Sequence, residues 1–250
     1  EIMKQKGFEF KYDFSSTSEK EKYQEEYDKM YAECKRTLYS AGYHIYTSID
    51  PDVQKQLQSS VDNALSGYTE KDKNGIYKTQ ASGTCIDNDT GKVVAIVGGR
   101  EQKNIGYTLN RAFQSPRQPG SAIKPLLVYA PALEHGWSAG STVNDSPMST
   151  KDKNRVRNSH GSYSGQISLR RAVQKSSNVA TMRIYEQLTP KTCLKYLEEM
   201  NFKYLTDSDY KYYTTCIGGF TKGTTSEEMA AGYATLKNDG VYREPTCISK

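Results

Sequence analysis

A serine and a lysine three residues apart, Ser121 and Lys124, are the residues of this sequence best suited to chemistry. Residues i and i+3 lie on the same face of a helix. A hydroxyl and an amine placed in this way suit nucleophilic catalysis, in which the amine takes the proton of the attacking serine. The positive end of a helix dipole also favours the negative charge that develops on such a serine. The spacing therefore predicts a serine nucleophile with a lysine as its partner.

The residues around this pair predict the helix that must carry it. Pro119 and Gly120 interrupt whatever precedes the helix, and Gly136 is suited to end it. Pro125 is tolerated because the N–H groups of the first turn have no intrahelical partner. The apolar residues between these points recur at helical spacing and predict one buried stripe, namely Ile123, Leu126, Leu127, Ala130 and Leu133.

A second polar fragment, Ser176-Ser177-Asn178, interrupts another helical pattern. Ser168 can cap a short helix before it, and Val179 resumes a helix after it. A polar kink between two helices can direct Ser176 and Asn178 into a cleft, although Ser-Ser-Asn also suits an ordinary turn. Only the fold can bring this fragment to Ser121.

With its flanking sequence, the chain resembles the transpeptidase domain of class A penicillin-binding proteins from about Ile45 to the end. The resemblance implies an α+β fold of the penicillin-binding protein/serine β-lactamase type, in which helices flank an antiparallel sheet. It rests on a series of motifs in the order of that family, at residues 44–50, 97–100, 109–112, 117–125, 144–147, 165–170, 176–178, 218–219 and 228–234.

The resemblance implies functions for four residues. Ser121 would be acylated by a D-Ala-D-Ala stem peptide of peptidoglycan or by a β-lactam, and Lys124 would act in proton transfer. Ser176 would relay a proton toward the leaving amine, and Asn178 would hydrogen-bond the substrate amide. Which group is the acylation base is disputed for this family. The implied enzyme is a serine-type D,D-transpeptidase that cross-links peptidoglycan, is a target of β-lactam antibiotics and needs neither cofactor nor metal.

Two other classes of function remain open. D,D-carboxypeptidases and serine β-lactamases share the Ser-x-x-Lys pattern but pass the acyl group to water, and the motif at residues 97–100 argues against them. A non-catalytic β-lactam sensor or a cell-wall-binding scaffold could also carry these residues. Because a sensor can still be acylated, only a cross-linked product would separate it from a transpeptidase.

The third motif of the family, Lys-Thr-Gly or Lys-Ser-Gly on a sheet-edge strand, is not found. Lys222-Gly223-Thr224 has the wrong order and precedes a helix that Thr225 and Glu228 start with a capping box. We expect the motif to lie beyond Lys250, in a missing C-terminal segment or in a second chain that completes the fold. The fragment alone is then expected to have an uncovered strand edge and an incomplete site.

Composition narrows the range of partners. The 34 basic and 29 acidic residues leave a net charge of +5, and no basic stripe indicates nucleic acid. No apolar run is long enough to cross a bilayer, so a membrane contact is expected only through an anchor of the full-length protein, at the extracytoplasmic face of a bacterial cell membrane. The five cysteines lack C-x-x-C spacing and the three histidines lie apart from them, which argues against a metal site and for buried thiols.

Two regions are predicted along the chain. Residues 1–78 are expected to form an interdomain linker module, with a helix from Ser18 and another that Asp50 caps and Pro51 begins. Residues 79–250 are expected to form the N-terminal part of the transpeptidase domain, opened by a hairpin of strands at 81–86 and 93–97. Residues 137–167 are turn-rich and without clear periodicity, which predicts loops beside the cleft.

Overall fold

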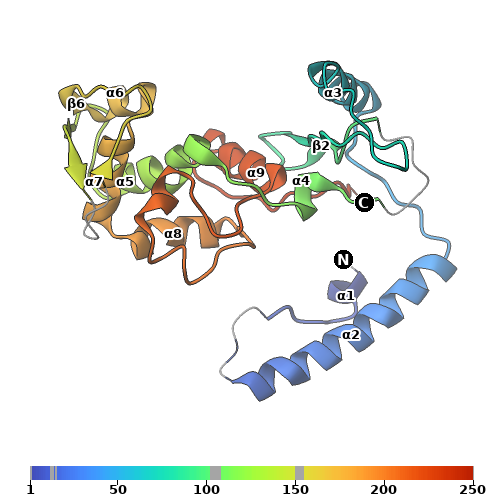
Figure 1. Cartoon of the computed structure of the whole chain (residues 1–250). Coiled ribbons are helices and arrows are strands. Elements are labelled where there is room, and N and C mark those ends of the chain that lie inside the picture. The colour runs from blue at the N-terminus through green and yellow to red at the C-terminus, as the bar shows by residue number, and fades with distance from the viewer. Residues whose placement is uncertain (1, 12–13, 15, 102–107, 150–154, 250) are drawn as a thin grey trace. The chain divides into compact units, whose positions relative to one another are not determined.

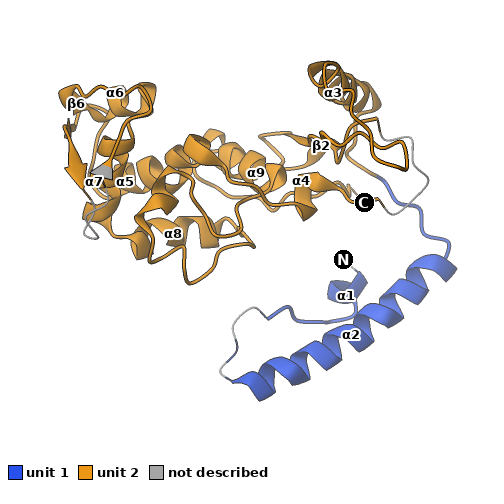
Figure 2. Ribbon diagram, in the orientation of Figure 1, with its two compact units in different colours: residues 1–46, 250 blue, residues 47–249 orange. Residues whose placement is uncertain are grey.

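The computed structural model describes residues 2–11, 14, 16–101, 108–149 and 155–249 (Figure 1). The chain divides into two compact units, residues 1–46 together with residue 250, and residues 47–249 (Figure 2). The predicted boundary between a linker module and the following domain, after residue 78, stays a prediction.

The first unit consists of α1 (Ile2–Gln5) and the long helix α2 (Thr17–Ser40). The Ser16 hydroxyl caps α2 by accepting a hydrogen bond from the Glu19 N–H at 3.2 Å. The helix therefore begins earlier than the predicted Ser18, because Ser16 and Glu19 offer the same cap spacing as Ser18 and Glu21. One face of α2 joins an aromatic cluster of Phe8, Phe10, Phe14, Tyr23, Tyr27 and Tyr31.

The second unit opens with α3 (Pro51–Ala64), which Asp50 caps as predicted. The predicted hairpin is confirmed as β1 (Gly83–Ile86) and β2 (Val93–Val97), paired antiparallel. Gln54 fixes α3 to β2, since its side chain donates to the Ile96 carbonyl at 2.9 Å and accepts from the Ile96 N–H at 2.8 Å. On β2, the Val93 N–H donates to the Thr246 carbonyl at 2.9 Å, so the end of the described chain lies beside this strand.

The prediction of loops at residues 137–167 is wrong where four short strands occur. Strand β3 (Thr142–Asp145) pairs antiparallel with β6 (Gly165–Ser168), and β4 (Met148–Ser149) pairs with β5 (Arg155–Val156). These strands are short, and Thr142 finds its partner Ser168 far along the sequence. Periodicity over two to four residues is too brief to indicate a strand, so the pairing is set by tertiary contacts.

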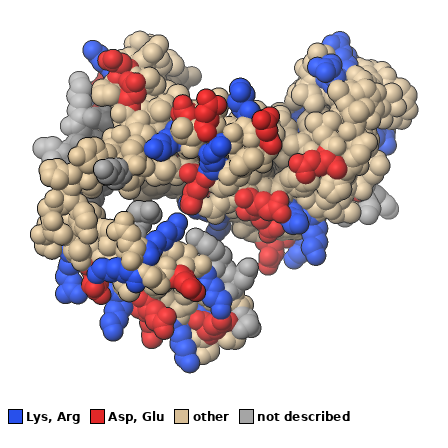
Figure 3. All heavy atoms as spheres, turned by 180° about the vertical axis from the view of Figure 1, so that it is seen from behind, with Lys and Arg blue, Asp and Glu red and all other residues tan. Residues whose placement is uncertain are grey.

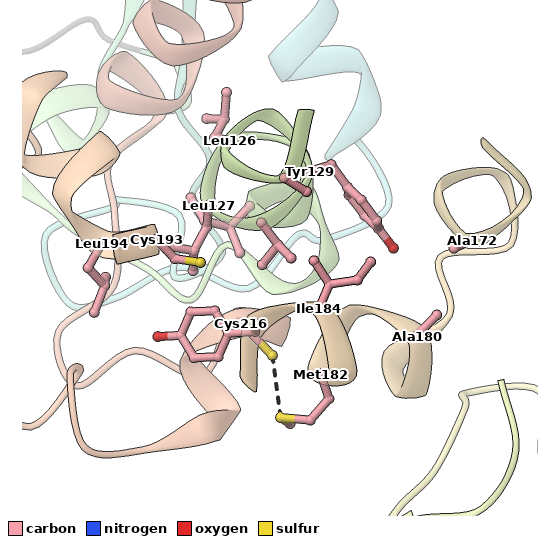
Figure 4. Packing of buried hydrophobic residues seen from close by; sticks show 14 of the residues in the cluster. Leu126, Leu127, Tyr129, Ala172, Ala180, Met182, Ile184, Cys193, Leu194 and Cys216 are labelled. Carbon is pink, nitrogen blue, oxygen red and sulfur yellow. Dashed lines mark hydrogen bonds between the residues drawn. The ribbon is translucent and has the colours of Figure 1, made fainter. Parts of the chain in front are cut away.

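Buried apolar side chains from η2, α7, α8 and η3 form one core in the second unit (Figure 4). Leu127, Ile184 and Leu194 are fully buried there. No helix in the described part of the chain is both long and apolar enough to cross a membrane. Besides α3, the described helical elements of this unit are α4 (Arg111–Gln114), η1 (Gly120–Ile123), η2 (Pro125–Tyr129), α5 (Ala130–Glu134), α6 (Leu169–Gln174), α7 (Asn178–Leu188), α8 (Pro190–Glu199), η3 (Tyr213–Ile217) and α9 (Ser226–Lys237).

The helix predicted after Ser121 is present but irregular. It starts as a 3-10 turn (η1), continues as a π-helical turn (η2) in which the Ala130 N–H bonds to the Pro125 carbonyl, and ends as α5. Because 3-10 and π turns advance by a different angle per residue, the buried stripe departs from regular helical spacing. Leu133, predicted to be buried, is therefore 50% exposed.

Charged side chains of both signs are interspersed on the face drawn in Figure 3. Neither sign gathers there into one large patch. Basic and acidic residues, which are nearly equal in number in the sequence, are thus intermixed on this face, as is usual for a solvated protein surface.

The irregular helix provides a matched test of the core. Leu127→Ala is expected to lower the free energy of unfolding by about 2–5 kcal/mol, because it opens a cavity in a fully buried cluster. Leu133→Ala, in the same helical segment but half exposed, should stay within about 0.5 kcal/mol of the parent. Urea unfolding of both variants measures this, and equal losses would contradict the packing described.

Candidate functional site

Lys124 is at the centre of the site, and its side chain is buried although it carries an amine. The residue is 2% exposed. Its Nζ donates to the Ser176 carbonyl at 2.8 Å, to Ser176 Oγ at 3.1 Å and to Asn178 Oδ1 at 2.7 Å. Burial lowers the pKa of Lys124 from 10.5 to about 8, against the weaker opposing effect of the Cys216 thiol. About a tenth of the Lys124 side chains are then neutral amines at pH 7, far more than at the unperturbed pKa, and only the neutral form can accept a proton.

Ser121 lies on the same helical turn as Lys124. The Lys124 N–H donates to the Ser121 carbonyl, and this bond closes the 3-10 turn η1. Because residues i and i+3 eclipse one another in a 3-10 helix, the serine and lysine side chains leave the turn on the same side. Ser121 is exposed to solvent, and no hydrogen bond joins its hydroxyl to the Lys124 amine among the contacts of the described residues.

The predicted kink between two helices brings Ser176 and Asn178 to Lys124. Helix α6 ends before Lys175, α7 begins at Asn178, and Ser176 between them has a left-handed backbone with φ 49°. Ser177 caps α7, its hydroxyl accepting from the Ala180 N–H at 3.0 Å, and is fully buried. The turn therefore directs its first and third side chains toward Lys124 and its second into the protein.

A second segment holds the chain just before the serine. Arg117 and Thr224 exchange two backbone hydrogen bonds, each of 2.9 Å. The Gln118 side chain accepts from the Phe220 N–H at 2.7 Å and donates to the Phe220 carbonyl. The next residue, Thr221, donates both its N–H and its hydroxyl to buried Asp209, at 2.7 and 2.9 Å. Residues 117–118, which precede Ser121, are thus held by the loop of residues 220–224, and that loop is itself hydrogen-bonded to Asp209.

Two glycines allow this close approach. A Cβ on Gly218 would lie 2.2 Å from the Gly120 carbonyl oxygen, and one on Gly223 would lie 2.4 Å from the Arg117 carbonyl. Lys222 therefore belongs to the turn that holds Arg117. The capping box of Thr225 and Glu228, predicted from the sequence, follows directly.

Of the four predicted site residues, the structure joins Lys124, Ser176 and Asn178 by hydrogen bonds and places Ser121 one turn from Lys124. Sequence reasoning missed two buried polar residues behind the turn, Asp145 and Asn158. Asp145 was part of a family-like motif but had no function attached to it. Asn158 falls in the segment predicted as loops, where a single polar residue carries no signal.

A cavity of about 570 Å³ lies elsewhere on this unit and includes none of the four predicted residues. It has both an acidic and a basic residue in its wall. We therefore place the candidate site at Ser121, Lys124, Ser176 and Asn178, on the basis of their side-chain chemistry, and not at this cavity. The residues that line the cavity are Trp137, Thr142, Val143, Asn144, Gln166, Arg183, Glu186 and Gln187.

Comparison with known proteins gives one consistent family. Residues 81–250 match the model of the penicillin binding protein transpeptidase domain. The chain is 34% identical over 247 residues to penicillin-binding protein 1A of Clostridium perfringens, covering 91% of this chain and 35% of that protein. It is 32% identical over 250 residues to penicillin-binding protein 4 of Bacillus subtilis, covering 100% of this chain and 37% of that protein. The chain thus spans about a third of the length of the curated relatives it matches.

The fold agrees with the sequence match. The structure of the penicillin-binding protein PonA1 from Mycobacterium tuberculosis superposes with a TM-score of 0.69 at 25% sequence identity, covering 85% of this chain and 54% of that one. The predicted fold class, α+β with antiparallel strands flanked by helices, is confirmed. The strands form three two-stranded sheets in the described residues.

The contact between Gly218 and Gly120 can be tested against a matched glycine. Gly136 also has a positive φ, of 87° against 93° for Gly218, but nothing lies within 4 Å of a Cβ placed on it. Gly136→Ala is expected to cost about 1–2 kcal/mol of stability from the backbone alone. Gly218→Ala should cost a further 1–3 kcal/mol, roughly the price of overpacking, because the Gly120 backbone must move.

Chemical denaturation of the two variants measures this difference. A crystal structure of Gly218→Ala is expected to show residues 117–121 displaced. Equal destabilisation by the two substitutions, with Ser121 unmoved, would mean that the 218 loop does not hold the serine.

Proposed function

Because this chain belongs to the penicillin-binding protein transpeptidase domain family, we propose that it acts as a D,D-transpeptidase through a Ser121 acyl-enzyme. Its substrates would be peptidoglycan stem peptides that end in D-Ala-D-Ala, and β-lactams would acylate the same serine. The observation that carries the proposal is the buried Lys124 amine, hydrogen-bonded to Ser176 and Asn178 and placed on the turn of Ser121.

The number of donors and acceptors around Lys124 indicates which groups bind its N–H groups and which can bind its lone pair. A neutral amine has two N–H donors and one lone pair. The Ser176 carbonyl and Asn178 Oδ1 can only accept, so they take the two donors. The lone pair is then left for a hydroxyl, that of Ser176 or of Ser121. Because a hydroxyl both donates and accepts, Ser176 can stay bonded to Lys124 whether the amine is neutral or charged.

The proposed reaction follows from this arrangement. Ser121 Oγ attacks the carbonyl carbon of the D-Ala-D-Ala peptide bond, and its proton passes to the Lys124 amine. The C–N bond then breaks, and the departing D-Ala amine takes a proton relayed through Ser176. An amine of a second stem peptide attacks the ester and releases Ser121. General-base assistance of this kind contributes on the order of 10²–10⁴ in rate.

Asn178 has a double function in this proposal. Its Oδ1 accepts from Lys124, and its Nδ2 donates to the Arg157 carbonyl at 2.9 Å. The amide is thereby fixed in one orientation. A carbonyl oxygen has two lone pairs, so Asn178 Oδ1 can accept a second hydrogen bond from an N–H of the substrate backbone.

The wider setting is part of the same proposal. The full-length protein would act at the extracytoplasmic face of a bacterial cell membrane, through an anchor outside these residues. A Lys-Thr-Gly or Lys-Ser-Gly segment would complete the site. Hydrolysis by a D,D-carboxypeptidase or serine β-lactamase is the alternative enzyme activity, and a β-lactam sensor or wall-binding scaffold is the alternative without turnover.

The proposal predicts one covalent adduct. The full-length protein, incubated with a β-lactam, is expected to gain the mass of one opened β-lactam on Ser121, as read by intact mass and peptide mapping. Ser121→Ala should lose the adduct, whereas Ser138→Ala, an exposed serine of the same unit, should keep it. Labelling that survives Ser121→Ala, or no labelling of the folded full-length protein, would contradict the proposal.

The acyl acceptor separates the alternatives. With a stem-peptide donor and an amine acceptor, a transpeptidase forms cross-linked product that Ser121→Ala abolishes. Release of free acid alone indicates a carboxypeptidase, and a stable adduct without either product indicates a sensor.

A further inference from the structure

The turn between α6 and α7 has a backbone that its own sequence does not favour. Ser176 has φ 49°, in the left-handed region that costs a residue with a side chain free energy relative to a right-handed or extended backbone. Yet this residue supplies two of the three acceptors of Lys124, its carbonyl and its hydroxyl. Interactions elsewhere must therefore stabilise the conformation.

Asp145, at the end of β3, supplies part of that stabilisation. Its carboxylate is fully buried and takes part in none of the ion pairs of the described residues. Hydrogen bonds solvate it instead: Oδ1 accepts from Ser177 Oγ at 2.8 Å and from Asn158 Nδ2 at 2.7 Å, and Oδ2 accepts from the Ser164 N–H at 3.0 Å. A buried carboxylate held in this way strongly favours the one arrangement that supplies its donors.

Asn158 supplies the remainder. Its Oδ1 accepts from the N–H groups of Asn178 and Val179, at 2.9 and 3.2 Å, which are the first two of α7. Such N–H groups have no partner within the helix. Its Nδ2 donates to Asp145 and to the Ser162 carbonyl, at 2.7 and 3.0 Å. The amide thus joins the β3–β6 region to the start of the helix that carries Asn178.

Ser177 connects the two. Its hydroxyl lies 2.8 Å from Asp145 Oδ1 and 3.2 Å from Asn158 Oδ1, and accepts from the Ala180 N–H. Asp145, Asn158 and Ser177 form one closed buried network directly behind Ser176 and Asn178. Each of the three is at most 4% exposed.

We propose that Asp145 and Asn158 are positioning residues, which hold residues 176–178 in the left-handed turn and thereby keep Ser176 and Asn178 bonded to Lys124. Neither residue touches the Lys124 amine in the described contacts, so they act through Ser177 and the α7 backbone. The inference rests on the proposed function of the turn in acyl transfer. It extends the site to the end of β3 and to Asn158, which lies between β5 and β6.

Three variants of the full-length protein test the network. Ser177→Ala removes only the hydroxyl and Asn158→Leu removes the amide. Asp145→Asn keeps the shape of the side chain but removes the carboxylate that accepts from Ser177, Asn158 and the Ser164 N–H. Leu197→Ala is the control, because it perturbs the core on α8 without touching the turn. The readouts are the acylation rate constant for a fluorescent β-lactam, its affinity before acylation, and the thermal midpoint.

Ser177→Ala and Asn158→Leu are expected to slow acylation about 10–100-fold, since small displacements of acid–base groups have effects of that order. Affinity before acylation should also fall where Asn178 moves, because Asn178 is proposed to hydrogen-bond the substrate. Asp145→Asn should slow acylation in the same range, and a parent rate in that variant would overturn the positioning function of Asp145. Leu197→Ala should lower the thermal midpoint yet acylate at close to the parent rate. Parent acylation rates in Ser177→Ala, or in folded Asn158→Leu, would overturn the proposal, as would an equal rate loss in Leu197→Ala.

A structural readout keeps this inference separate from the proposed function. A crystal structure of Ser177→Ala is expected to show Ser176 outside the left-handed region and Lys124 Nζ beyond hydrogen-bond distance of Asn178. An unchanged turn overturns the inference even where the parent protein is acylated. If the parent is not acylated on Ser121 but the turn changes as expected, the proposed function fails and the positioning inference stands.

Discussion

Burying one lysine amine is the constraint on which the rest of this structure depends. Lys124 is nearly inaccessible to solvent, so protein groups must replace the water that would solvate its amine. All three acceptors come from one turn, at Ser176 and Asn178. The position of that turn must therefore be fixed closely. Lys124 and residues 176–178 must be held at hydrogen-bond distance although they are far apart in sequence. The lowered pKa of the amine is the chemical result of the same burial.

Two separate sets of contacts hold Lys124 and its acceptors in place. On one side, the backbone pairing of Arg117 with Thr224 and the close contact of Gly218 with Gly120 fix the start of η1. On the other, helices α6 and α7 flank a left-handed serine. Between them the 3-10 geometry of η1 puts Ser121 and Lys124 on one side of the chain. The site thus consists of a short 3-10 turn and an irregular turn between two helices, both next to the apolar core.

The parts that sequence reasoning predicted are those with local causes. Asp50 with Pro51, Ser168, and Thr225 with Glu228 all act as helix caps, since a cap needs only residues within one turn. The β1–β2 hairpin likewise carries its turn in its own sequence. Ser121 and Lys124 could be identified from the sequence because a spacing of three residues places two side chains on the same side of a helical turn.

The parts that it missed have distant causes. Strands β3 and β6 have four residues each and are separated by residues 146–164, so no local pattern in either strand indicates its partner. Leu133 follows the helical period but is exposed, because the π turn shifts the face that α5 buries. Asn158 became visible as part of the site only through hydrogen bonds to Asp145 and to the start of α7. Long-range polar networks leave no periodic trace in a sequence.

The ionisation of Lys124 is the most direct measure of this account. We would follow the 13Cε and 15Nζ resonances of the side chain against pH, assigned by their absence in Lys124→Met. The amine is expected to be charged below a midpoint near pH 8 and neutral above it, because burial disfavours the charged form. A midpoint near the unperturbed value of about 10.4 would mean that the amine is solvated, and would contradict the buried site described.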